Sequence, residues 1–392
     1  MATHTLRLKK NREFALLKGH PWVFGDALTA LPPGLATGDE AAVVSHKGEP
    51  LGLGYVDTDS NILVRLVEGA AGESLDQRIN ARLTGAIRLR LGCFDGSDTT
   101  AYRLVNGEGD GLPGLVIDRY ADALSLQLYS LGLEPRLDLI VRTLVAQVPG
   151  LRWIWRRNQV KRAAANAGAG LLFGRDLPAK IRFREGGLQF QTDLQHGQKT
   201  GFFLDQRDNR QLVRRFARGR RVANVCGYTG GFTVAAIAGG AVRTLTIDTA
   251  RPALVEAEAN LALNRFAGPA HELRAADMFE FLAAPGEAFD LIVLDPPSMA
   301  RSQADVPQAL KAYHKLNHDA LRRLPRGGLL FTASCTGHVH RDAFLEMLVQ
   351  AALRARRPVR LLAETHHAPD HPVALGHPEG RYLKGFLLEV GG

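Results

Sequence analysis

Apolar and polar positions follow a strand–helix rhythm in the C-terminal half of the chain. From residue 197 onward, the predicted elements are strands over 222–225, 243–248, 291–294 and 329–333, and helices over 231–238, 253–266 and 341–356. This alternation is typical of a parallel sheet covered by helices on both faces. The pattern therefore predicts an α/β, Rossmann-like domain.

The N-terminal half has a different pattern. Short apolar runs separated by glycines suit a small β-barrel, with strands over 22–24, 40–44, 51–56 and 61–66. A helical pattern covers 75–91, and strands mixed with a helix over 138–147 follow. Because 392 residues are too many for one compact core, we expect three domains. These are a β-barrel over 1–72, a central α+β domain over 73–185 and the α/β domain over 186–392.

The composition is that of an ordinary globular protein, with 45% hydrophobic and 23% charged residues. The basic N-terminus lacks the apolar core of a signal peptide, and no apolar run reaches the ~18 residues that span a bilayer. We therefore expect a cytoplasmic protein with no membrane partner. Three scattered cysteines suit neither a disulfide framework nor a CxxC metal site, so no metal is expected. A homodimer is left open.

Basic residues account for the net charge of +9 and gather in two stretches. The first stretch contains Arg152, Arg156, Arg157, Lys161, Arg162, Arg175, Lys180, Arg182 and Arg184. The second contains Arg210, Arg214, Arg215, Arg218, Arg220 and Arg221. Such clusters suit a polyanion such as RNA, because each phosphate contact releases condensed counterions. Solvated basic faces without a partner are the alternative.

The segment NVCGYTGGF (224–232) forms a glycine-rich turn between a predicted strand and a helix. Gly227, Gly230 and Gly231 let the backbone approach a ligand and point free amide groups at it. The spacing is not G-x-G-x-x-G, so the usual dinucleotide fingerprint is missing. A buried turn without a ligand is the alternative.

Acidic residues follow the next two strands of the predicted sheet. Asp248 lies 21 residues after Gly227, where a carboxylate can accept both ribose hydroxyls of a nucleoside. Asp277, at the end of the third strand, can accept from an adenine amino group. A lone aspartate at such a place is usually a helix cap. The combination with the glycine turn fits S-adenosylmethionine, an adenosine without a pyrophosphate.

Two further motifs carry candidate chemistry. LDPPS (294–298) places Asp295 at the end of a buried strand, and SCTG (334–337) places Cys335 at the same sheet edge. A thiolate that adds to cytosine C6 makes C5 nucleophilic enough to attack a sulfonium methyl, and a base must then remove the C5 proton. Cys335 as nucleophile and Asp295 as proton handler or base-orienting group fit this cycle. An inert buried thiol is the alternative for Cys335, and a structural stop is the alternative for the two prolines.

At these residues the chain resembles the RlmI-type cytosine-C5 methyltransferases of large-subunit (23S) ribosomal RNA. The resemblance covers nearly the whole chain, and its strongest carriers are HGQKTGFFLDQRDNR (196–210), NVCGYTGGF, LDPPS, SCTG and HPEGRYLKGF (377–386). It implies an RNA-binding PUA domain, a small α+β domain and a class I methyltransferase domain.

The resemblance also implies a set of site residues. Cys335 would be the catalytic thiol, with Asp295 beside it. The cofactor-binding residues would be Phe203, Asp205, Gln206, Arg207, Asn224, Gly227, Tyr228, Asp248, Asp277, Met278, Asp295 and Pro297. Two positions depart from patterns in related enzymes. Ser298 stands where many RNA cytosine-C5 enzymes have a second cysteine, and Met299 stands where this family often has an aromatic residue.

The sequence leaves three candidate functions. The leading one is the formation of 5-methylcytosine in 23S ribosomal RNA through a covalent cysteine adduct. The second is methylation of another RNA base without covalent catalysis. The third is a non-catalytic RNA-binding factor in ribosome assembly.

Overall fold

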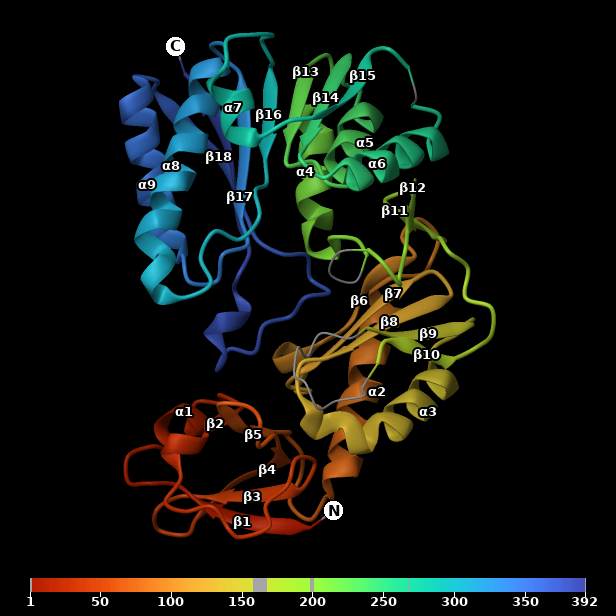
Figure 1. Ribbon diagram of the computed structural model, residues 1–392, viewed down its shortest axis with the longest axis vertical. Helices are drawn as coiled ribbons and strands as arrows, with labels where there is room; N and C mark the ends of the chain where they lie inside the picture. Colours follow the sequence, from red (N-terminus) through yellow and green to blue (C-terminus); the bar gives the residue numbers. More distant parts are fainter. Residues whose placement is uncertain (1, 158–167, 198–200, 267, 392) are drawn as a thin grey trace. The chain divides into compact units, whose positions relative to one another are not determined.

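The computed structural model describes residues 2–157, 168–197, 201–266 and 268–391 (Figure 1). Within the described chain, residues group into two compact units. The first unit comprises Met1–Phe183, Thr192–Phe202 and Pro369–Gly380, and the second comprises Arg184–Gln191, Phe203–Ala368 and Arg381–Gly392. The division into three domains at residues 72 and 185 stays a prediction.

The first unit begins with a small sheet whose strands run in the order β1-β3-β4-β5-β2. They are β1 (Thr3–Arg7), β2 (Trp22–Phe24), β3 (Glu40–Val44), β4 (Pro50–Val56) and β5 (Ile62–Leu66). The short helix α1 (Phe14–Leu17) lies between β1 and β2. Leu6, Val43 and Val64 belong to a core of their own. The strands predicted over the first 70 residues are confirmed. The structure adds β1, which lies in the basic N-terminus, where the sequence pattern predicts no strand.

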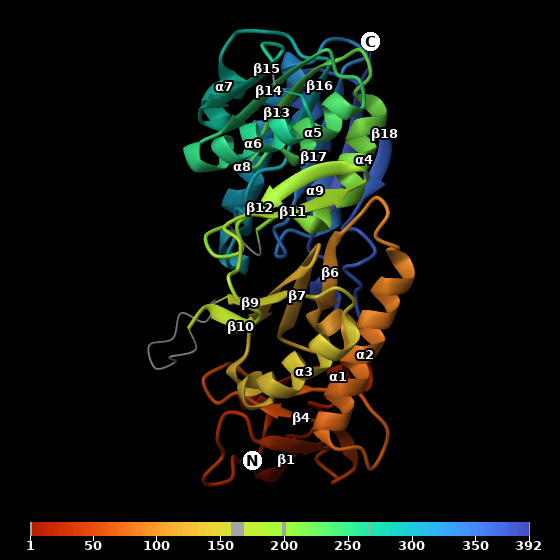
Figure 2. The same cartoon turned by 90° about the vertical axis from the view of Figure 1, so that its right-hand side faces the viewer.

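A second sheet in the same unit has the order β10-β9-β8-β7-β6. Its strands are β6 (Ala101–Asn106), β7 (Leu115–Tyr120), β8 (Ala123–Leu128), β9 (Trp153–Arg157) and β10 (Gly170–Phe173). Helices α2 (Leu75–Cys93) and α3 (Leu137–Gln147) pack beside each other, and their buried side chains join the core of this sheet (Figure 2). Ser74 and Gln77 cap α2 reciprocally. The helical pattern over 75–91 is confirmed.

The second unit is built on a mixed sheet with strand order β15-β14-β13-β16-β17-β19-β18. The strands are β13 (Arg221–Val225), β14 (Arg243–Asp248), β15 (His271–Ala275), β16 (Leu291–Leu294), β17 (Leu329–Ser334), β18 (Val359–Thr365) and β19 (Lys384–Val390). Neighbours from β15 to β17 pair in parallel, whereas β19 is antiparallel to both β17 and β18. The predicted α/β class is confirmed.

Helices cover this sheet on both faces (Figure 1). One core contains side chains of α7 (Met278–Ala283), α8 (Val306–Arg323) and α9 (Arg341–Ala355). The other core contains side chains of α4 (Arg207–Phe216) and α5 (Gly231–Ala238), and α6 (Arg251–Leu263) packs against α5, β14 and β15. The hairpin β11 (Ile181–Glu185) and β12 (Leu188–Thr192) precedes α4 in the chain. None of the helices in the described part of the chain is long and apolar enough to cross a membrane.

The strand order places a site at one edge of the sheet. From β13 the chain moves outward through β14 and β15, and it then returns to the other side of β13 to form β16. The order of a parallel sheet thus reverses between β13 and β16. Ligands of open α/β sheets bind at the carboxyl ends of the strands beside such a reversal.

Candidate active site

The glycine-rich turn follows β13 at this edge. Cys226 and Tyr228 have positive φ angles of 62° and 47°, which side-chain-bearing residues rarely adopt and which concentrate at functional sites. Gly227 N donates to Ile247 O at 2.9 Å. A Cβ atom on Gly227 would lie 2.3 Å from Thr246 Cγ2, so a glycine is required here by the packing against β14. The close approach of this backbone to a ligand stays a prediction.

Asn224 lies inside the sheet below this turn. Its Nδ2 donates to Thr233 Oγ1 at 2.9 Å, and Thr233 shares a hydroxyl hydrogen bond of 2.6 Å with Thr246. Its Oδ1 is buried and has no hydrogen-bond partner among the described residues. A buried acceptor without a donor costs about 1–3 kcal/mol. Asn224 thus joins the start of α5 to β13 and β14 and keeps one acceptor available.

The two predicted nucleoside-binding carboxylates are both held by backbone amides. Asp248 accepts from Tyr228 N at 2.8 Å and from Ala250 N at 2.9 Å, one amide on each carboxylate oxygen. Asp277 caps α7, and its Oδ1 accepts from Phe279 N and Glu280 N at 2.8 and 3.0 Å. The helix-cap alternative is therefore correct for this oxygen of Asp277. Its Oδ2 has no partner among the described side chains and amides, so it keeps lone pairs for a ligand.

Cys226 lies where the carboxylates of this edge converge. Burial raises the pKa of the Cys226 thiol, and the negative charges of Asp248, Asp295 and Asp277 raise it further. Its Sγ contacts Met278 Sδ at 3.2 Å. The three aspartates that the sequence placed at separate strand ends thus act on a single thiol. Cys226 is held as a neutral thiol.

The FFLDQR segment (202–207) contacts the glycine turn and the DPP loop (295–297). The Phe203 ring packs edge-on against Tyr228, with centroids 5.1 Å apart. Gln206 Nε2 donates to Asp295 Oδ2 at 2.9 Å. Asp205 Oδ2 accepts from the Tyr382 hydroxyl at 2.7 Å. Arg207, the first residue of α4, is buried and lies 3.7 Å from the Asp208 carboxylate. The structure therefore brings Phe203 to the glycine turn and Gln206 to Asp295, and the cofactor-binding roles of Asp205 and Arg207 stay predictions.

Asp295 and Cys335 follow adjacent parallel strands, β16 and β17. Pro297, next to them in the DPP loop, is exposed. The two loops are joined through Thr336, whose Oγ1 accepts from Met299 N at 3.1 Å and bonds the Tyr313 hydroxyl at 2.7 Å. Burial raises the pKa of Tyr313, and negative charge on Cys335 and Asp295 adds to this effect. Both predicted catalytic groups thus lie within electrostatic reach of one buried tyrosine of α8.

Many residues of the two basic stretches serve inside the fold. Arg210 forms a buried two-pronged ion pair with Glu185, with both contacts at 2.6 Å. Arg156 pairs in the same way with Glu134 at 2.5 Å, and Arg221 pairs with Asp290. Lys161 and Arg162 lie outside the described residues. Arg156 and Arg210 are buried in these pairs and are not on the surface that a polyanion would contact, whereas Arg221 stays partly exposed.

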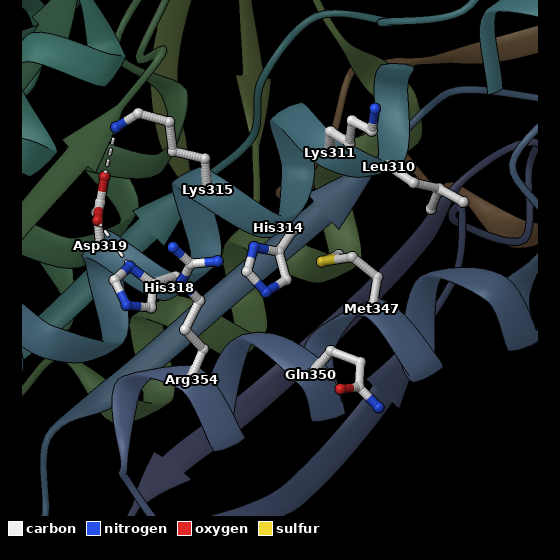
Figure 3. A pocket seen from close by; sticks show the side chains of 9 residues that line it. All are labelled: Leu310, Lys311, His314, Lys315, His318, Asp319, Met347, Gln350 and Arg354. Carbon is white, nitrogen blue, oxygen red and sulfur yellow. Dashed lines mark hydrogen bonds and ion pairs between the residues drawn. The ribbon is translucent and has the colours of Figure 1, made fainter. Parts of the chain in front are cut away.

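A basic groove lies between α8 and α9 (Figure 3). Its charged and imidazole side chains are Lys311, His314, Lys315, His318, Asp319 and Arg354, and Gln350, Leu310 and Met347 complete its lining. Lys315 and His318 both contact the Asp319 carboxylate at 2.8 Å, and the positive charge of Lys315 offsets the negative charge of that carboxylate. Figure 3 shows the His314 ring between these residues and Lys311. The groove therefore presents cationic and polar donors on the outer surface of α8 and α9.

Among the described residues, one His/Glu group has the spacing of metal ligands: His20, His377 and Glu379. Trp22 N, however, donates to His20 Nδ1 at 3.2 Å. The proton of a neutral His20 must then reside on Nε2, which faces Glu379 at 3.5 Å. A metal-bound imidazole needs a lone pair on that nitrogen. This cluster is better described as an imidazole N–H that faces a carboxylate.

Comparisons with known proteins agree with this arrangement. A family model described as S-adenosylmethionine-dependent methyltransferase matches residues 155–376, and one described as a PUA-like domain matches residues 6–68. The ribosomal RNA large subunit methyltransferase of Deinococcus radiodurans is 37% identical over 397 residues, which cover 98% of this chain and 97% of that protein. The ribosomal RNA large subunit methyltransferase I of Shigella boydii is 38% identical over 394 residues, covering 98% and 99%. The chain belongs to this methyltransferase family.

Solved structures show the same fold. A putative S-adenosylmethionine-dependent methyltransferase from Streptococcus mutans aligns over 100% of both chains with a TM-score of 0.85 and 24% identity. A putative methyltransferase in complex with SAH aligns over 100% of both chains with a TM-score of 0.84. The Rossmann-like methyltransferase domain and the PUA-like domain are thereby confirmed.

The cofactor of this methyltransferase family is S-adenosylmethionine, and the residues at the sheet edge suit it chemically. Asp248 and Asp277 carry carboxylate oxygens of the kind that accept from hydroxyl and amino donors such as those of an adenosine, and Asn224 Oδ1 is a buried acceptor without a donor among the described residues. Phe203 and Tyr228 contribute apolar ring surface next to Asp248. Sequence reasoning missed Tyr313 and Lys384 as members of this region, although Lys384 lies in the quoted HPEGRYLKGF motif.

Proposed function

We propose that this methyltransferase forms 5-methylcytosine in 23S ribosomal RNA, with Cys335 as the covalent nucleophile. The observation that carries the proposal is the placement of Asp295 and Cys335 at the ends of adjacent strands, with their loops joined by the hydrogen bond from Met299 N to Thr336 Oγ1. The full-length relatives are named for large-subunit ribosomal RNA, which supports this substrate class. The PUA-like domain supports an RNA partner.

Each residue would have a defined part in the reaction. The Cys335 thiolate forms a bond to cytosine C6, and the electrons of the C5=C6 bond make C5 nucleophilic. Bound S-adenosylmethionine supplies the methyl group that C5 takes up. Asp295, held by Gln206 at 2.9 Å, orients the base or accepts a proton. Loss of the C5 proton to a base restores the double bond, and the C6–S bond breaks so that sulfur leaves as a thiolate.

The α8–α9 groove, defined by Lys311, His314, Lys315, His318, Asp319 and Arg354, supports the RNA part of the proposal. Lys311 and Arg354 are exposed. Exposed cations of this kind bind phosphates regardless of base sequence, while residues at the catalytic edge select the target base. We assign the groove to the phosphate backbone of the substrate.

An adduct experiment tests the covalent mechanism. Ribosomal RNA transcribed with 5-fluorocytidine should trap wild-type protein, because fluorine at C5 cannot leave as a proton. Cys335→Ala should trap none and transfer no methyl group, yet it should bind S-adenosylmethionine nearly as well as wild type. Cys93→Ala, at an exposed thiol, is the matched control and should trap RNA fully.

Other outcomes separate the alternatives. Methyl transfer by Cys335→Ala would point to another RNA base or atom and a non-covalent route. Wild-type protein that neither binds S-adenosylmethionine nor methylates RNA would point to an assembly factor. Mass-spectrometric mapping of the product identifies the methylated nucleotide, and a modified base other than cytosine contradicts the proposal.

A further inference from the structure

Lys384 is a buried lysine beside the candidate nucleophile. It is the first residue of β19, and it lies directly opposite Ser334 in the antiparallel pairing of β19 with β17. Cys335 follows Ser334 in the chain. Lys384 is only 5% exposed, a rare condition for a lysine in a folded protein. The topology of the sheet therefore places a cation next to the thiol-bearing loop.

The ammonium group of Lys384 has unusual partners. Its Nζ donates to Thr336 O at 2.7 Å and to Tyr382 O at 3.0 Å, and both acceptors are neutral carbonyls. Among the described residues, no carboxylate lies within ion-pair distance of Lys384. Burying an ammonium group without an opposite charge is costly. Such a group is retained where its charge is needed, and buried groups of this kind cluster at functional sites.

Lys384 lies within electrostatic reach of Cys335, since its Nζ donates to the carbonyl of the next residue, Thr336. Burial lowers the pKa of Lys384 to about 8, and negative charge on Cys335 acts in the opposite direction. Tyr313, which approaches from α8, stays protonated because burial raises its pKa. Asp295, which approaches from the end of β16, shares Tyr313 with Cys335 and disfavours a thiolate through like charge. Lys384 thus supplies positive charge that offsets this carboxylate.

We propose that Lys384 is a positioning residue that holds Cys335 as a thiolate and fixes the loop that carries it. This inference rests on the proposed function of Cys335 as the nucleophile. A neighbouring ammonium group stabilises the thiolate before it attacks C6. When the C6–S bond breaks, the electron pair returns to sulfur, and the same charge stabilises the departing thiolate. Lys384 thereby assists thiol release in a chain where Ser298 replaces the second cysteine of related enzymes.

The test measures the reactivity of Cys335 as a function of pH without RNA. Full-length protein is treated with iodoacetamide, and alkylation of each of the three cysteines is followed by mass spectrometry of its own peptide. In wild type, Cys335 should react with a lower pH midpoint than the exposed thiol of Cys93. Lys384→Met should raise the Cys335 midpoint by about one unit, which lowers its thiolate fraction about tenfold at pH 7. Lys384→Arg should restore most of the reactivity.

Activity measurements complete the test. Lys384→Met should lower kcat for methyl transfer about tenfold, with an unchanged KM for RNA and unchanged S-adenosylmethionine binding. A Cys335 midpoint equal to that of Cys93 in wild type, or unchanged in Lys384→Met, overturns the inference. The wild-type comparison stands even if Lys384→Met fails to fold. A shifted midpoint without any RNA adduct contradicts the proposed function but leaves the charge pairing intact.

Discussion

The side chain of Gln206 donates a hydrogen bond of 2.9 Å to the carboxylate of Asp295, although 89 residues separate the two in the chain. Gln206 Oε1 in turn accepts from Asn209 Nδ2 at 2.5 Å. The amide therefore has a fixed orientation, with its donor side toward Asp295. This contact connects the FFLDQR segment to the DPP loop and sets the direction of one oxygen of the candidate proton handler.

Gln206→Ala should lower methyl transfer by at least about tenfold, because Asp295 loses a donor that orients it. The free energy of unfolding should fall by about 1–3 kcal/mol, since Asn209 is left with an unpaired buried donor. Kinetics and urea denaturation measure both effects. Gln189→Ala, at an exposed residue of β12 outside the groove, is the control, and equal behaviour of the two variants would contradict the role of Gln206.

The buried pair of Arg210 and Glu185 should be a major contributor to the stability of the second unit. Removing one partner leaves an uncompensated buried charge, so Glu185→Ala should lower the free energy of unfolding by about 3–5 kcal/mol. Arg341 and Glu364 form a comparable two-pronged pair that is exposed. Glu364→Ala should cost no more than about 1 kcal/mol. Similar losses in the two variants would refute the importance of burial.

The α8–α9 groove should bind the phosphate backbone of RNA. Lys311→Glu combined with Arg354→Glu should weaken RNA binding for all sequences, and the slope of log K against log salt should become shallower by about 1 to 2. Cofactor binding should stay unchanged. Arg215→Glu, at an exposed residue of α4 in the second basic stretch, should leave RNA binding unchanged if that stretch is only a solvated face. RNA affinity that falls in Arg215→Glu but is unchanged in the Lys311→Glu, Arg354→Glu double variant would reverse this assignment.

Lys384 should give the stability of the protein a distinct pH dependence. Its pKa in the folded protein is lowered from 10.5 to about 8. Between these two values the unfolded chain binds more protons than the folded one, so the contribution of Lys384 to stability rises with pH. Lys384→Met should remove this rise, whereas Lys311→Met on the exposed surface of α8 should preserve it. Urea denaturation at several values between about pH 7 and 10.5 measures the difference, and parallel curves for Lys384→Met and wild type would contradict it.

Local patterns allowed much of the α/β fold to be predicted. Apolar periodicity identified the strand that ends at Val225 and the helix α5 with its observed bounds. Because parallel strands end at one edge, Asp248, Asp277 and Asp295 were expected near one another, and all three act on Cys226. Charge patterning was less informative. Arg210 and Arg156 look like surface residues in the sequence, but their partners Glu185 and Glu134 come from other elements.

The sequence by itself determined the order of strands and helices, the glycine turn and the acidic strand ends, since these depend on residues a few positions apart. Tertiary structure decided which distant residues meet. The antiparallel strand β19 brings Lys384 opposite Ser334, and α8 brings the Tyr313 hydroxyl to Ser334 and Thr336, the two neighbours of Cys335. The periodicity of apolar residues along the sequence does not encode such contacts. They arise from the pairing of segments about 50 residues apart and from burial in a shared core. The chemistry assigned to Cys335 depends on that pairing.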